Sequence, residues 1–165
     1  MTLSKKPVLL AGGGINYADA NQELIAFAER YQIPVVSTLL GLGAMPIEHD
    51  LSLGMGGMHG SYASNMALTE ADFILNIGAR FDDRLTGRVN SFAVDMTVAH
   101  VDVDPAEIGK VIKTDIPVVG DAKKTLEMLL RFDQVETDFK EWTTHVLDNK
   151  RRAPFAYDED ENFVK

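Results

Sequence analysis

Short runs of apolar residues recur along the chain between segments of helical or turn-like character. The runs are rich in Val, Ile or Leu and do not alternate with polar residues, which is typical of strands covered on both faces of a sheet. They are Pro7 to Ala11, Pro34 to Thr38, Phe73 to Ile77, Thr97 to Val103, and Ile116 to Val119. The pattern predicts buried, parallel strands.

Three of the intervening segments carry helix signals. Residues from about 19 to 31 have one apolar face, formed by Leu24, Phe27, Ala28 and Tyr31. Asp104 to Glu107 predicts a helix start, because Asp104 could cap it and Pro105 fits the first helical position. Asp121 could cap a third helix, whose inner face would be Leu126, Leu129 and Leu130.

Alternating strands and helices predict an α/β protein with a Rossmann-like three-layer fold and a mainly parallel sheet of about six strands. We place this domain at residues 1–131. Residues 132–165 are poorer in apolar side chains and end in the acidic run 158–161. We interpret them as a solvated linker with one helical piece around residues 136 to 149, leading toward a C-terminal domain absent from this chain.

Composition narrows the possible functions. About 45% of the residues are hydrophobic, enough for a core, and the absence of cysteine excludes disulfides and thiolate metal sites. The formal charge of −9 argues against nucleic-acid binding. No signal peptide and no apolar run of about 20 residues is visible, so we expect a cytoplasmic protein without membrane contacts.

The residues that follow the predicted strands include glycines, hydroxyls, arginines and carboxylates. Because ligands bind at the carboxyl ends of the strands in open parallel sheets, these residues are expected to form one binding edge. They are found in the segments Ala11 to Gly14, Ser37 to Leu39, Gly78 to Arg84, Asp102 to Asp104, and Gly120 to Asp121.

Two of these segments favour a diphosphate. Gly12, Gly13 and Gly14 allow backbone N–H groups to approach phosphate oxygens, although a tight strand-to-helix turn explains the triplet equally well. Arg80 and Arg84 could clamp a diphosphate, or could pair with Asp82 and Asp83 on the surface.

Other candidates have similarly open interpretations. Asp102 could accept hydrogen bonds from a ribose, whereas Thr38, Asp104 and Asp121 could be ordinary turn or cap residues. The segment 54–60, Gly-Met-Gly-Gly-Met-His-Gly, could lie along a planar ligand or could be a flexible loop. The four histidines form no pair with metal-ligand spacing, and no catalytic constellation is evident, so the predicted chemistry is binding.

At these positions the sequence resembles the middle domain of acetolactate (acetohydroxyacid) synthases, a group of thiamine-diphosphate enzymes. The resemblance covers about residues 5 to 131 and is carried by segments 37–43, 54–60, 78–87 and 100–110. The element Arg80-Phe81-Asp82-Asp83-Arg84-Leu85-Thr86-Gly87 is the most specific, because related decarboxylases share the fold but usually lack it.

The resemblance implies an enzyme that condenses pyruvate with pyruvate or 2-oxobutanoate, releasing CO2, in branched-chain amino acid biosynthesis. It implies thiamine diphosphate and Mg²⁺ in domains absent from this chain, and FAD in a largely structural role in this one. The isolated fragment is expected to be inactive. Expected partners are the remaining domains of the synthase and a second catalytic subunit, with a regulatory subunit as a further candidate.

The resemblance implies no catalytic or metal-binding residue in this chain. It implies a set of residues that contact the cofactor, to which Arg84 is added because of its charge. These are Gly12, Gly13, Gly14, Thr38, Leu39, Gly56, Gly57, Met58, His59, Gly78, Ala79, Arg80, Phe81, Asp82, Arg84, Asp102, Val103, Asp121 and Ala122.

Three alternatives stay open at this point. The same domain occurs in glyoxylate carboligase, sulfoacetaldehyde acetyltransferase and oxalyl-CoA decarboxylase, the last of which can hold an ADP-like group instead of FAD. A free-standing nucleotide-binding regulatory module is a second alternative. An NAD dehydrogenase is the least favoured, because no proton-transfer group accompanies the glycine turn.

Overall fold

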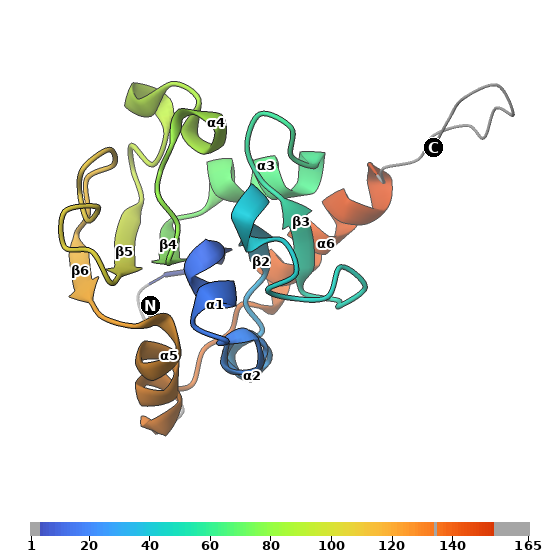
Figure 1. The fold of residues 1–165 in the computed structure, drawn as a ribbon. Coiled ribbons are helices and arrows are strands. Elements are labelled where there is room, and N and C mark those ends of the chain that lie inside the picture. Colours follow the sequence, from blue (N-terminus) through green and yellow to red (C-terminus); the bar gives the residue numbers. More distant parts are fainter. Residues whose placement is uncertain (1–3, 134, 154–165) are drawn as a thin grey trace, which may run out of the picture.

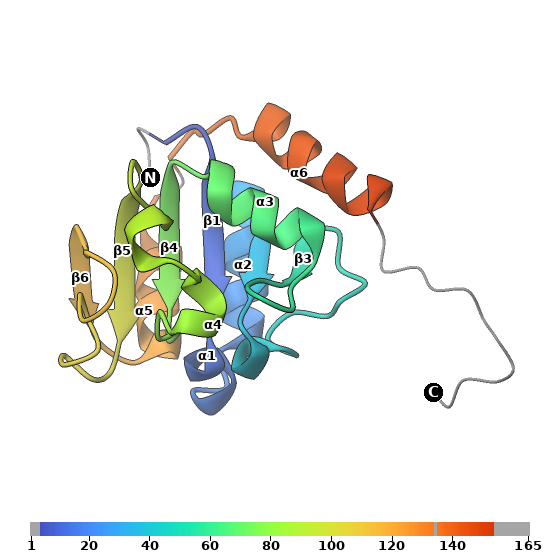
Figure 2. The same ribbon diagram turned by 90° about the horizontal axis from the view of Figure 1, so that it is seen from above.

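A six-stranded, wholly parallel sheet with helices on both faces forms the centre of the computed structural model, which describes residues 4–133 and 135–153 (Figures 1 and 2). The strands lie in the order β3-β2-β1-β4-β5-β6. They are β1 Pro7–Ala11, β2 Val35–Ser37, β3 Ser52–Met55, β4 Phe73–Ile77, β5 Thr97–Asp102 and β6 Ile116–Val119. The predicted fold class is confirmed, and each of the five predicted runs contains a strand.

The helices divide between the two faces of the sheet according to the direction of the strand side chains. Leu9, Leu75 and Val101 face the layer of α1 (Gly13–Tyr17), α2 (Asn21–Tyr31) and α5 (Ala122–Arg131). Leu10 and Ile74 face the layer of α3 (Tyr62–Glu70), α4 (Asp83–Thr86) and α6 (Lys140–Arg152). Two short 3-10 turns, η1 (Leu39–Gly41) and η2 (Val89–Ser91), complete the fold.

The apolar face predicted for the first helix is confirmed, because all four of its residues are buried in α2. Asp121 caps α5 as predicted, accepting a hydrogen bond from the Lys124 backbone N–H at 3.0 Å. The helix predicted to start at Asp104 is wrong. Residues 105–109 form turns that end at Gly109, whose φ of +73° is left-handed, and the segment has no periodic apolar face to hold a helix on the sheet.

Helix α6 runs along the amino ends of three strands. The Trp142 indole Nε1 donates to the Pro7 carbonyl at 2.9 Å, the Thr143 hydroxyl donates to the Gln32 carbonyl at 2.7 Å, and Lys150 Nζ donates to the Ser52 carbonyl at 2.6 Å. These acceptors lie at the start of β1, just before β2 and at the start of β3. The helical piece predicted around residues 136 to 149 corresponds to α6, but this helix packs on the sheet and is not part of a solvated linker.

None of the helices within residues 4–133 and 135–153 has the length and apolar character needed to cross a membrane.

Candidate ligand-binding site

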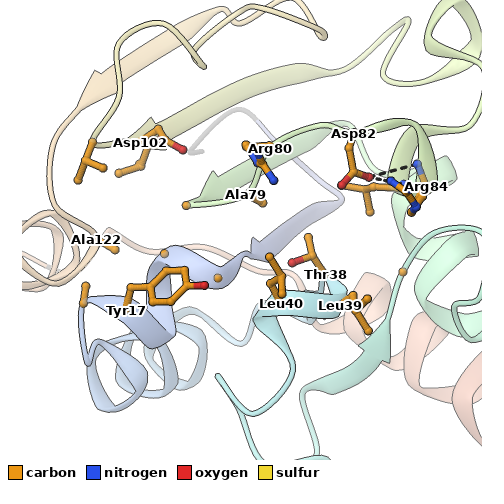
Figure 3. Close-up of a pocket in the computed structure, with 18 of the residues that line it drawn as sticks. Tyr17, Thr38, Leu39, Leu40, Ala79, Arg80, Asp82, Arg84, Asp102 and Ala122 are labelled. Atoms are coloured by element: carbon orange, nitrogen blue, oxygen red, sulfur yellow. Dashed lines mark hydrogen bonds between the residues drawn. The ribbon is translucent and has the colours of Figure 1, made fainter.

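A cavity of about 740 Å³ opens at the carboxyl edge of the sheet. Helix α6 lies at the opposite, amino edge (Figure 2). The strand order reverses between the adjacent strands β1 and β4, which carry β2 and β3 on one side and β5 and β6 on the other. In doubly wound sheets this switch point is where ligands bind. In Figure 3, Tyr17, Asp102 and Ala122 lie toward one end of the cavity, Leu39 and Arg84 toward the other, and Arg80 between them.

The turns that follow β1 and β4 touch through their backbones. Gly12 N–H donates to the Ile77 carbonyl at 2.9 Å, and Gly14 N–H donates to the Gly78 carbonyl at 3.0 Å. A Cβ atom on Gly12 would lie 2.0 Å from the Gly78 oxygen. The first and third glycines therefore permit this contact. Of the three N–H groups, only that of Gly13, at the first position of α1, has no backbone acceptor among the described residues. The triplet is both a tight turn and a single potential phosphate donor.

A buried amide fixes the turn after β4. The Asn76 side chain is inaccessible to solvent, donates to the Ala79 carbonyl at 2.7 Å and accepts from the Ala79 N–H at 3.1 Å. Gly78 bends the chain with a φ of +63°. Ala79 is thereby held against the core while the Arg80 side chain stays exposed at the cavity. Sequence inspection missed Asn76, although a polar residue inside an apolar strand was a signal that could have found it.

The two arginines of this segment differ in their surroundings. Arg80 forms no ion pair within the part of the chain that the structure describes. Arg84 Nη1 lies 3.6 Å from Asp83 Oδ1, with both side chains exposed, so that this contact contributes little. Asp82 caps α4, because its Oδ1 accepts from the Arg84 and Leu85 N–H groups at 3.1 Å each. The surface-pairing interpretation thus applies to Arg84, whereas Arg80 is left available for an anion.

The glycine-rich loop after β3 is a fixed structure. The Met58 N–H donates to the Arg84 carbonyl at 2.7 Å, and Asn65 of α3 exchanges two hydrogen bonds with the Gly57 backbone. Met58 and His59 are left exposed at the cavity, with 71% of Met58 accessible. Asn65 was not predicted, since nothing in its local sequence marks it.

Apolar side chains cover the neighbouring part of the cavity wall. Thr38 accepts a hydrogen bond from the Gly41 N–H at 3.1 Å and so caps η1, which presents Leu39 and Leu40 to the cavity. Both leucines are more than half exposed. Together with Met58 they form a surface suited to one face of a planar ring system.

Carboxylates line the opposite end. Asp102 accepts from the Asp104 N–H at 2.9 Å through Oδ1, while its side chain is only 12% exposed. Asp121 lies at the cavity beside Ala122, and its cap of α5 leaves it half-buried. Asp121 is therefore both a helix cap and a cavity residue, so that both interpretations of this residue from the sequence fit the structure.

Most of the predicted site residues line this one cavity. The exceptions are Gly12, Gly57 and Phe81, which lie behind the wall and shape it: Phe81 is buried against Phe92 and His100. The structure adds lining residues that lie outside the predicted set of cofactor neighbours, namely Tyr17, Ala18, Leu40, Met55, Leu85, Val101 and Gly120. Within the described residues, no three His, Asp or Glu side chains are arranged to hold a metal ion.

The strand order and the cavity at its switch point define the class of this protein, a Rossmann-like α/β domain with a cavity at the carboxyl edge of its sheet. More narrowly, the chain belongs to the thiamine pyrophosphate enzyme family, whose central-domain profile matches residues 1–129.

Curated relatives agree with this assignment. The chain is 56% identical over 158 residues to the acetolactate synthase large subunit of Lactococcus lactis subsp. lactis, and 49% identical over 160 residues to that of Corynebacterium glutamicum. It is 38% identical over 171 residues to the isozyme 3 large subunit of Escherichia coli K12. The alignments cover 96%, 94% and 100% of this chain, but only 28%, 26% and 30% of the relatives.

Proposed function

We propose that this chain is the cofactor-holding central domain of an acetolactate synthase and that its cavity binds FAD. The observation that carries the proposal is the Arg80 side chain, which has no ion pair among the described residues and lines the same cavity as Gly13 at the start of α1. A guanidinium group and a backbone N–H in one cavity suit a diphosphate. In a protein of formal charge −9, an arginine side chain without a carboxylate partner is consistent with a site for an anionic ligand.

The two ends of the cavity fit the two ends of FAD. Asp102, Asp121 and the backbone around Val103 offer acceptors and donors for a ribose and an adenine, whereas Leu39, Met58 and His59 offer an apolar and adaptable surface for the flavin ring. The cavity of about 740 Å³ falls within the usual range of cofactor sites, roughly 300–1,000 Å³.

In this proposal the complete enzyme condenses pyruvate with a second 2-oxo acid and releases CO2. Thiamine diphosphate and Mg²⁺ supply that chemistry in other domains, and the residues of this chain bind and orient FAD, which has a largely structural role. We expect the isolated fragment to be inactive, because thiamine diphosphate and Mg²⁺ would be held by the other domains. Its partners are the other domains, a second catalytic subunit and, as a further candidate, a regulatory subunit. The high identity to named large subunits supports this enzyme over the other thiamine-diphosphate enzymes considered above.

A fluorescence titration of FAD into the purified chain tests the proposal, with ADP and NAD titrated in parallel. We expect saturable binding that prefers FAD, and an Arg80→Ala variant with a Kd raised by about 10- to 100-fold, since charge-assisted hydrogen bonds contribute roughly 1.5–3 kcal/mol. Arg88→Ala is the matched control, because Arg88 is exposed but does not line the cavity. ADP binding as tight as FAD binding would favour an ADP-dependent relative, and equal effects of both arginine variants would contradict the assigned site.

A further inference from the structure

His100, on β5, is a fully buried imidazole two residues before Asp102, which lines the cavity. Its solvent exposure is 0%, it lies opposite Asn76 of β4 and Pro117 of β6, and its ring meets the edge of the Phe81 ring at a centroid distance of 5.4 Å. Neither ring nitrogen has a hydrogen-bond partner among the described residues. Because a buried imidazole N–H without a partner destabilises a protein, this arrangement calls for an explanation.

Two acceptors lie near the ring. Asp102 Oδ2 is 3.9 Å from His100 Nε2, and the Ala79 carbonyl, which already accepts from Asn76, approaches the ring as well. Burial lowers the pKa of His100, and the carboxylates of Asp102 and Glu107 and the Ala79 carbonyl raise it by smaller amounts. The net effect keeps the ring neutral near pH 7, so that it has one N–H to donate and its tautomer decides which acceptor receives it.

Asp102 is the only one of these neighbours that also faces the cavity as a carboxylate among the described residues. Its Oδ1 is held by the Asp104 N–H, whereas its Oδ2, 3.9 Å from His100 Nε2, has no hydrogen bond within the described residues. A shift of about 1 Å would bring Oδ2 within hydrogen-bond distance of Nε2. The carboxylate would then be fixed on both sides, with its remaining lone pairs directed at the cavity.

We propose that His100 is the positioning residue for Asp102, donating Nε2–H to Oδ2 and so orienting the carboxylate toward the hydroxyl groups of an adenosine ribose. This inference rests on the proposed function for the identity of the ligand. The proposal gives His100 a role that acts only through Asp102, because the buried ring does not line the cavity.

A matched set of substitutions tests the role. His100→Gln places an amide N–H close to the position of Nε2, His100→Asn places it close to Nδ1, and His100→Phe keeps the ring against Phe81 without any donor. The measured quantity is the ratio of the Kd of 2′,3′-dideoxy-ADP to that of ADP. We expect a ratio of about ten in the parent and in His100→Gln, since one to two hydrogen bonds depend on the ribose hydroxyls. In His100→Asn and His100→Phe the ratio falls toward one, with the affinity for the dideoxy ligand unchanged. A ratio that is the same in all four proteins overturns the proposal.

The tautomer of His100 gives a second test that needs no ligand. Ring ¹⁵N chemical shifts of the free chain are expected to show the Nε2–H form, and Asp102→Asn is expected to lower the pKa of His100 further, since the favourable carboxylate is lost. An Nδ1–H ring would mean that the proton does not serve Asp102, and would overturn the inference. If the parent bound neither FAD nor ADP, the proposed function would fail, while the tautomer would still decide the role of His100.

Discussion

Asn65 holds Gly57 by two hydrogen bonds, accepting from its N–H at 2.8 Å and donating to its carbonyl at 2.9 Å. The Asn65 amide on α3 thus satisfies both backbone groups of Gly57, as a neighbouring strand would do in a sheet. The next residue, Met58, donates to the Arg84 carbonyl, so that a hydrogen bond also links the glycine-rich loop to α4. The loop after β3 and α4, which are far apart in the sequence, are therefore connected in the structure.

Replacing Asn65 should loosen the cavity wall without changing any residue that lines it. For Asn65→Ala we expect the Kd of FAD to rise about tenfold, because the loss of ordered loop contacts corresponds to roughly 1–1.5 kcal/mol. Hydrogen exchange at Gly57 and Met58 should accelerate in the same variant. Asn90→Ala, at an exposed position in η2, is the control. Unchanged exchange in the loop would show that the amide is dispensable.

Substitution of Gly12 should damage the fold itself. In Gly12→Ala the new methyl group would overlap the Gly78 carbonyl, which is backbone and cannot rotate away. We expect a loss of about 3 kcal/mol in the free energy of unfolding, measured by urea denaturation. Gly120→Ala is the comparison, since its methyl group meets only the rotatable Thr125 hydroxyl at 3.2 Å. Equal stability of the two variants would contradict the backbone contact between the β1 and β4 turns.

Asp72 should make the stability depend on acid pH. Partial burial raises the pKa of Asp72, but hydrogen bonds from the Ser4 hydroxyl and the Lys5 and Lys6 N–H groups outweigh it, and the net pKa is below its usual value. A carboxyl whose folded-state pKa is depressed stabilises the protein above its unfolded-state pKa of about 3.9, and this contribution disappears as pH falls through the lower folded value.

Asp72→Asn should therefore be less stable than the parent at pH 7, with the difference shrinking as the pH falls below about 4. Urea denaturation at several pH values measures this. Asp95→Asn, at an exposed position, should show no such trend. A difference that stays constant down to pH 2 would argue that Asp72 acts through packing rather than through its charge.

Trp142 allows the docking of α6 to be followed directly, because it is the one tryptophan of the chain. It is buried, and its indole donates to the Pro7 carbonyl. We expect its fluorescence and the far-UV circular dichroism to change in a single unfolding transition, and Trp142→Ala to lose about 3–5 kcal/mol. Thr144→Ala, exposed on the same helix, should have little effect. A fluorescence change that precedes the main transition would mean that α6 undocks independently.

The sequence predicted the parts of this fold that carry strong periodic signals. The buried strands and the face of α2 were found because continuous apolar runs and helical spacing reflect burial directly. Strand β3 was missed, since Ser52-Leu53-Gly54-Met55 is short, contains glycine and lies at the edge of the sheet. Helix α3 was missed because its buried face consists largely of small residues such as Ala63, Ser64 and Ala67, which give almost no amphipathic contrast.

The candidate site, like the fold, was predicted only in part. Topology alone brings the carboxyl ends of parallel strands to one edge, so residues such as Gly13, Arg80 and Asp102 were predictable as neighbours. The supporting residues Asn65, Asn76 and His100 were not recognised, because their roles depend on partners that only the folded backbone places beside them. Tyr17 reaches the cavity from the last residue of α1, a short helix that the sequence did not predict.

The position of α6 separates the packing of the C-terminal helix from the cavity. Its bonds to Pro7, Gln32 and Ser52 all lie on the amino edge of the sheet, and the cavity lies on the other. Substitutions that change how α6 packs on the amino edge are therefore expected to leave the cavity at the carboxyl edge intact, so that the two edges of the sheet can vary independently.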